Sequence, residues 1–133
     1  MFQFKKENTT LNINEIDKLA CEFWGVPYDN KHYATPNPSV WGMPNWFDIV
    51  GHAVEDLQYF AGTHEGKKIF YRSIDSNVAE FTFGEIAAMV LANNTRFCDN
   101  PEELKNMVEF LQPYLNFCYY LKSLGIVGIG MGW

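Results

Sequence analysis

The chain has little positive charge. Its 133 residues include 10 Lys and Arg against 16 Asp and Glu, which gives a formal net charge of −6. Proteins that bind nucleic acid through its backbone neutralise phosphates with a surplus of cations. We therefore expect no nucleic-acid partner. Mimicry of nucleic acid by acidic side chains is a weaker alternative, because only 20% of the residues are charged.

Cysteines are also few. Cys21, Cys98 and Cys118 are widely spaced and form no Cys-x-x-Cys pair, so the simplest interpretation is a set of unpaired thiols in a reducing compartment. No apolar run follows Lys5 and Lys6, so we expect no signal peptide and a cytoplasmic location.

Residues 110–133 carry a single charge but also polar side chains and glycines, which favours packing on protein over a membrane span.

Motifs of catalysis and cofactor binding are missing. The sequence has no phosphate-binding glycine loop, no nucleophile elbow and no pair of histidines at metal-ligand spacing. The residues that come nearest to a catalytic or metal site are Asp48, His52 and Glu55, which share one face of a predicted helix. His64 is a further weak metal candidate. A small enzyme or ligand-binding domain centred on this face is the alternative function. A solvated helix face is the simpler interpretation, so we expect no enzyme, no metal and no cofactor.

Apolar and aromatic residues are abundant, at 47% and 17% of the chain. This content suits a single domain over residues 1–133 with a sizeable core. Hydrophobic periodicity and capping residues predict an α+β fold that is mainly α. The four expected helices span about 13–24, 46–61, 83–93 and 101–124.

Helix starts are the strongest local signals. Asn12 is a predicted N-cap, Thr82 begins a Thr-x-x-Glu capping box, and Asn100 is followed by proline at the first helical position. Between the second and third helices, β-branched and aromatic residues on either side of a polar turn predict a small antiparallel hairpin over about 67–81.

The C-terminal segment 125–133 alternates glycine with large apolar residues, ending with Met131 and Trp133. This alternation predicts an extended tail with one apolar face and one face of bare backbone. Four exposed apolar side chains would be unfavourable, so we expect the tail to dock. Its own core and a neighbouring subunit are the two alternatives.

The apolar residues exceed what one chain of this length would bury. The helix over 101–124 has two apolar stripes, and the proline-rich loop over 25–45 carries large aromatics. This loop is either a strap over the core or a partner surface. The candidate interface residues are Tyr28, Tyr33, Trp41, Phe110, Phe117, Met131 and Trp133.

A surplus of apolar surface points to a partner. We therefore expect a small acidic, soluble interaction or regulatory protein. It would bind another protein or a second copy of itself, for example as a homodimer. A short motif-free chain of this kind is typical of an accessory bacterial or phage protein.

Overall fold

The computed structural model describes residues 2–6, 9–28, 35, 44–55 and 78–132. The fold is mainly α, as predicted, with four helices in the part of the chain that is described. They are α1 (Ile13–Trp24), α3 (Trp46–Glu55), α6 (Phe83–Thr95) and α7 (Pro101–Ser123). The predicted helix ends therefore agree within about two residues, except that residues 56–61 lie outside the described residues.

The capping predictions explain where these helices begin. Asn12 and Asn100 each accept a hydrogen bond, from the backbone N–H of Glu15 and of Glu103. Thr82 and Glu85 form the reciprocal capping box of α6. These side chains satisfy backbone donors that have no partner within the helix, which fixes each start at the predicted residue.

A four-stranded antiparallel sheet joins segments that are far apart in the sequence. Its strands are β1 (Phe2–Lys6), β2 (Thr9–Leu11), β3 (Val78–Thr82) and β4 (Ile126–Gly132), in the order β2-β1-β4-β3. Strands β1 and β2 were not predicted. The predicted hairpin at 67–81 lies mostly outside the described residues. Its described part belongs to β3, which pairs with β4.

Strand β4 runs close to β3 at Gly128. A Cβ atom at this position would overlap the carbonyl oxygen of Phe81 and would lie 3.3 Å from Cα of Thr82. Phe81 is buried, and Thr82 is the N-cap of α6. The absence of a side chain at Gly128 therefore lets the central strand approach the junction from which α6 begins.

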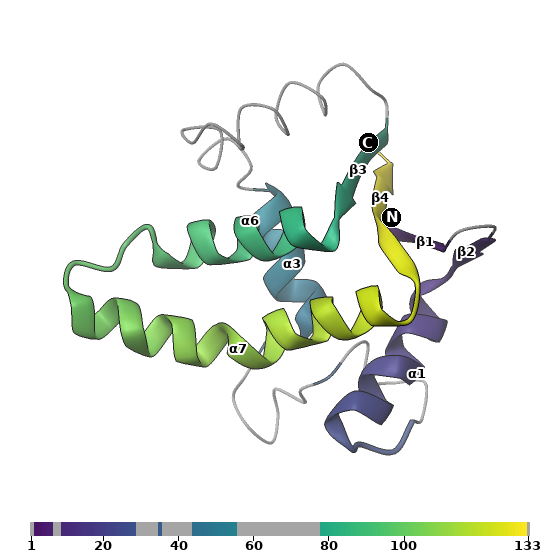
Figure 1. The fold of residues 1–133 in the computed structure, drawn as a ribbon, viewed down its shortest axis with the longest axis horizontal. Helices are drawn as coiled ribbons and strands as arrows, with labels where there is room; N and C mark the ends of the chain where they lie inside the picture. Colours follow the sequence, from purple (N-terminus) through teal and green to yellow (C-terminus); the bar gives the residue numbers. More distant parts are fainter. Residues whose placement is uncertain (1, 7–8, 29–34, 36–43, 56–77, 133) are drawn as a thin grey trace.

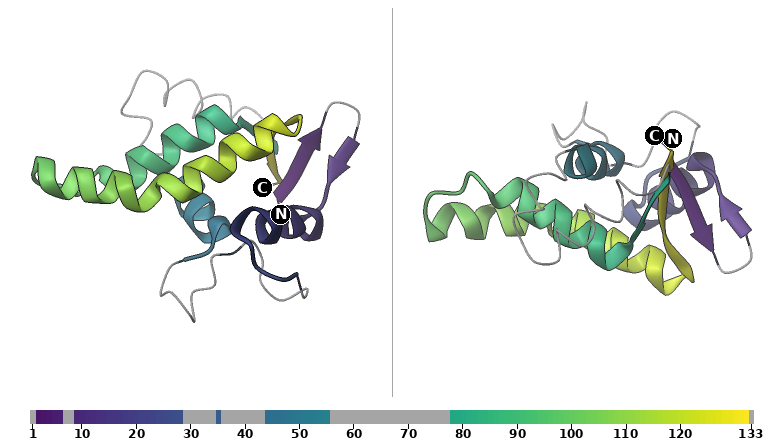
Figure 2. Two further views of the ribbon diagram at one scale, coloured as in Figure 1. Left: turned by 60° about the horizontal axis from the view of Figure 1, so that its bottom comes forward. Right: turned by 90° about the horizontal axis from the view of Figure 1, so that it is seen from above.

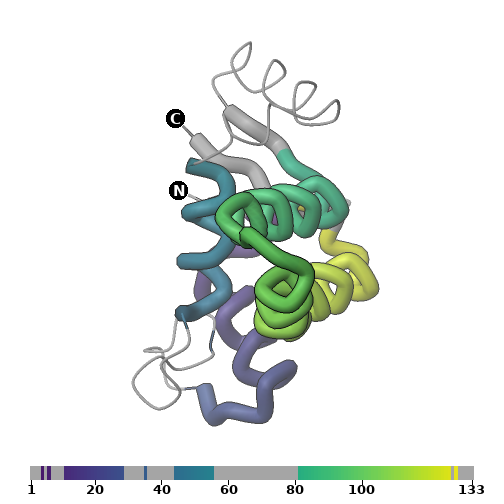
Figure 3. Tube along the Cα trace, turned by 90° about the vertical axis from the view of Figure 1, so that its left-hand side faces the viewer, coloured from purple at the N-terminus to yellow at the C-terminus, as the bar shows by residue number. Residues whose placement is uncertain are grey.

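Helices α6 and α7 lie side by side as a hairpin, and the turn that joins them is at the end far from the sheet (Figure 1). The views in Figure 2 show the same arrangement, with the distal part of the hairpin extending away from the sheet. Figure 3 looks along the hairpin from that distal end, with α3 beside α6.

The core lies where the helices and the sheet meet. Its largest buried side chains are Trp46, Tyr114, Phe4, Phe81, Phe83 and Phe117. The ring centroid of Phe117 on α7 lies 4.8 Å from that of Trp24 on α1 and 5.2 Å from that of Trp46 on α3. Three helices are thus held together at the sheet-proximal half of α7.

Candidate functional site

The His52 face of α3 is a solvent-exposed surface. His52 Nδ1 lies 3.8 Å from Glu55 Oε2, and their side chains are 73% and 76% exposed. Asp48 is also exposed, and its backbone N–H donates to Asn45 Oδ1 at the start of the helix. His64 lies outside the described residues. An ion pair this exposed contributes little free energy, so these three side chains form a solvated face.

Metal-ligating side chains do not gather elsewhere in the described part of the chain. Among those residues, no group of three or more His, Cys, Asp or Glu side chains is placed to hold a metal ion. None of the described helices is long and apolar enough to cross a membrane.

The predicted aromatic interface residues have different environments. Tyr28 is half-buried, with Lys18 Nζ 5.3 Å from its ring centroid. Phe110 is 39% exposed, whereas Phe117 is fully buried among the rings of α1 and α3. Phe117 is therefore part of the core of this chain and is not available at its surface.

The remaining predicted interface residues are not placed by the structure. Tyr33, Trp41 and Trp133 lie outside the described residues. The backbone of Met131 belongs to β4, where it pairs with Phe2 and Ala79.

The apolar stripe of α7 divides into a buried half and an exposed half. From Leu111 onward it is buried, through Leu115, Cys118 and Leu121. No residue of α7 before Leu111 is buried, and Leu104 is 45% exposed. The core therefore covers only the sheet-proximal part of the stripe.

Exposed apolar side chains gather at the distal end of the hairpin, residues 93–110, which we call the hairpin tip. Phe97, in the turn between the two helices, is 76% exposed, and Leu104 and Phe110 follow on α7. The Arg96 guanidinium lies 4.7 Å from the ring centroid of Phe97. Large apolar residues exposed together mark surfaces that bind a partner.

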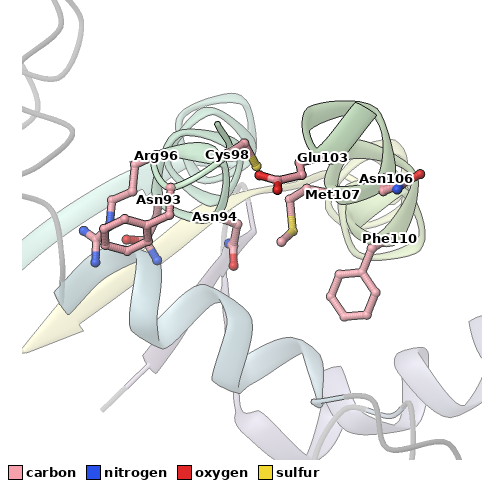
Figure 4. Close-up of a pocket in the computed structure, with 9 residues that line it drawn as sticks. Asn93, Asn94, Arg96, Cys98, Glu103, Asn106, Met107 and Phe110 are labelled. Atoms are coloured by element: carbon pink, nitrogen blue, oxygen red, sulfur yellow. The ribbon is translucent and has the colours of Figure 1, made fainter. Parts of the chain in front are cut away.

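A pocket of about 650 Å3 opens at the hairpin tip. Figure 4 shows Asn94 and Met107 directed into the space between α6 and α7, with Glu103 on the α7 side and Arg96 on the α6 side. The lining residues are Asn93, Asn94, Arg96, Phe97, Cys98, Glu103, Asn106, Met107 and Phe110. The pocket thus combines apolar side chains with amides and one charge of each sign.

One polar atom of the pocket wall lacks a partner. Oδ1 of Asn93 is buried and accepts no hydrogen bond from the described residues. An unpaired buried acceptor costs about 1–3 kcal/mol.

Local hydrogen bonds fix the turn that carries Phe97. The backbone N–H of Cys98 donates to the carbonyl of Thr95 over 3.0 Å. On the α7 side, the Asp99 N–H donates to Glu103 Oε2 and the Glu103 N–H donates to Asn100 Oδ1, each over 2.9 Å. These bonds hold the turn in one conformation, so Phe97 is presented from an ordered segment.

Sequence reasoning found Phe110 but missed the rest of this surface. Leu104 and Met107 belong to one of the two apolar stripes predicted for the helix over 101–124, whose exposed part was not identified, and Phe97 was given no role. The usable signal was Phe97 itself, a large apolar residue in the short polar segment before the Asn100–Pro101 helix start. A turn of this kind rarely buries such a side chain.

The three cysteines are free, with Cys21 and Cys118 buried and Cys98 partly exposed at the hairpin tip. Burial raises the pKa of the Cys118 thiol to about 12, because desolvation disfavours the thiolate. Burial likewise raises the pKa of the Tyr114 phenol to about 12, and this hydroxyl donates to the Pro44 carbonyl over 2.6 Å.

The raised pKa values predict a loss of stability in alkali. Because the unfolded chain releases these two protons at lower pH than the folded chain, the free energy of unfolding falls as pH rises above about 9. Deprotonation of each group lowers the free energy of unfolding by up to about 1.4 kcal/mol per pH unit. Urea unfolding at pH 7.5, 9 and 10 measures the slope. Cys118→Ala should make the slope between pH 9 and 10 shallower, and an unchanged slope would contradict the assignment.

Comparisons with known proteins identify no relative. The chain matches no protein-family model, and searches of curated proteins and of solved structures return no match.

Proposed function

We propose that this chain is a small interaction protein, acting as a regulator or assembly partner through the apolar surface of its hairpin tip. The single observation that carries the proposal is the exposure of Phe97, Leu104 and Phe110 at 76%, 45% and 39%. These side chains lie on a hairpin that extends away from the sheet (Figure 2). An extended hairpin can reach a partner without disturbing the rest of the fold.

Physical chemistry favours a bound partner for this surface. Burial of apolar area yields about 25 cal/mol per Å2, and aromatic side chains bury the most area per residue. Aromatic residues, methionine and arginine are the types enriched at the centres of interfaces, and Phe97, Met107 and Arg96 supply one of each. The tip therefore has the composition of a recognition surface.

The tip supports this function better than the His52 face supports catalysis. His52 and Glu55 are open to solvent, and neither lines the pocket at the hairpin tip. Catalytic acid–base pairs require an environment that positions and desolvates them.

The three free thiols support a reducing compartment such as the cytoplasm.

A size measurement in cell extract tests the proposal. We expect the tagged chain, in extract of the cell that expresses it, to elute from size-exclusion chromatography as a species larger than one chain. Phe97→Glu places a charge at the centre of the tip and should shift the chain to monomer size. Tyr119→Glu is the matched control, because Tyr119 is also exposed on α7 but lies outside the hairpin tip. Equal elution of the wild type and Phe97→Glu would contradict the proposal.

A further inference from the structure

We infer that the partner of the hairpin tip is a second copy of the same chain, with Phe97 of each copy inserted into the tip pocket of the other. This inference rests on the proposed function and specifies its partner. It follows from the shape and the charge of the tip.

The tip carries a projection and a recess next to each other. Phe97 is the most exposed large apolar side chain among the described residues, and it lines the pocket together with Met107 and Phe110. A two-fold axis through the tip would place each Phe97 opposite the recess of the other copy. Such a surface is self-complementary, as a two-fold interface requires.

The recess is large enough for this occupant. Its volume of about 650 Å3 lies in the range of pockets that enclose a ligand many times larger than water. An aromatic side chain with its adjoining backbone fits this space. Met107 offers a flexible thioether that adapts to a ring and interacts favourably with it.

Charge at the pocket is compatible with self-association. The whole chain carries a net charge of −6, so an acidic surface would repel its own copy. The pocket lining instead holds one cation, Arg96 on the α6 side, and one anion, Glu103 on the α7 side (Figure 4). Because a two-fold axis exchanges the two sides, Arg96 would approach Glu103 of the second copy.

Arg96 and Phe97 would enter the second copy together. The guanidinium already lies over the Phe97 ring, so insertion of the ring brings the charge to the mouth of the pocket.

The expected dimer is weak. The apolar surface of the tip comes from a few side chains, and interfaces below the standard size form transient complexes. We therefore expect a dissociation constant in the micromolar range, with monomer at nanomolar concentrations.

Thiol cross-linking of the purified chain tests the geometry. Cys98 lines the pocket, whereas Cys21 and Cys118 are buried, so a short bismaleimide joins two chains through Cys98 alone. At about 100 µM we expect a product of twice the chain mass. Phe97→Glu should reduce its yield at least tenfold, Tyr119→Glu should leave it unchanged, and Cys98→Ser should abolish it.

Sedimentation velocity of the same proteins gives a second measurement that needs no cysteine chemistry. The wild type and Tyr119→Glu should sediment faster as their concentration rises, and Phe97→Glu should sediment as a monomer throughout. A wild type that stays monomeric at 100 µM, or a dimer that Phe97→Glu retains, overturns the inference. A monomeric purified chain that still shows Phe97-dependent size in cell extract leaves the proposed function standing and assigns the tip to another protein.

Discussion

Gly128→Ala should strongly destabilise the native fold. The added Cβ would overlap the carbonyl oxygen of Phe81 and would lie 3.1 Å from its carbonyl carbon. Both atoms belong to backbone, so no side chain can rotate away. Strand β4 would have to separate from the edge strand β3, which breaks their pairing and displaces the N-cap of α6.

We expect a loss of about 3 kcal/mol or more, at the upper end of the range for overpacked sites. Urea unfolding followed by tryptophan fluorescence measures it. Gly84→Ala is the matched control, since a Cβ at Gly84 meets only Thr82 Oγ1 at 3.9 Å. That substitution lies within α6 and should be neutral or stabilising by about 0.5–1 kcal/mol. A Gly128→Ala variant as stable as Gly84→Ala would show that the strands do not approach as described.

Phe117→Ala should be among the most damaging truncations in the helical part of the fold. The side chain is fully buried, and its ring contacts those of Trp24 and Trp46 on two other helices. Removal of a buried phenyl ring costs about 3–5 kcal/mol, from lost transfer free energy and from the cavity left behind. Urea unfolding at pH 7.5 measures this value.

The same truncation at Phe97 is the internal comparison. Phe97 is 76% exposed, so Phe97→Ala should change the free energy of unfolding by less than about 0.5 kcal/mol at a concentration where the chain is monomeric. A large loss at Phe97, or a small loss at Phe117, would contradict the division between core and tip.

The helices were predictable because their signals are local. Asn12, Thr82 and Asn100 fix helix starts through hydrogen bonds to residues three positions away, and those spacings can be read from the sequence. The apolar stripe of α7 was equally visible. Each of these features depends on residues within one or two helical turns.

The sheet was not predictable in the same way. Strand β4 pairs Ile129 with Phe4 and with Phe81, contacts that span most of the chain. No local pattern specifies which distant segment completes such a ladder. In β1, Phe2 and Phe4 alternate with polar residues, which is a usable local signal for a strand, whereas β2 has only three residues.

The hairpin tip was only partly predictable, for a related reason. The stripe residues Leu104 and Leu111 are identical in type and lie seven residues apart, so periodicity treats them alike. Leu111 is fully buried and Leu104 is 45% exposed. The core covers the sheet-proximal part of α7 and does not extend to the first three turns of this helix. The extent of that cover is a property of the tertiary structure, and it decides which apolar residues are free to bind a partner.

Site-specific photo-cross-linking tests the central claim most directly. A benzophenone amino acid in place of Phe97 should form, on illumination in the expressing cell, an adduct of twice the mass of the chain. The same probe in place of Tyr119, which is exposed outside the hairpin tip, should form none. If the yield at Phe97 does not exceed the yield at Tyr119, the hairpin tip is not a recognition surface.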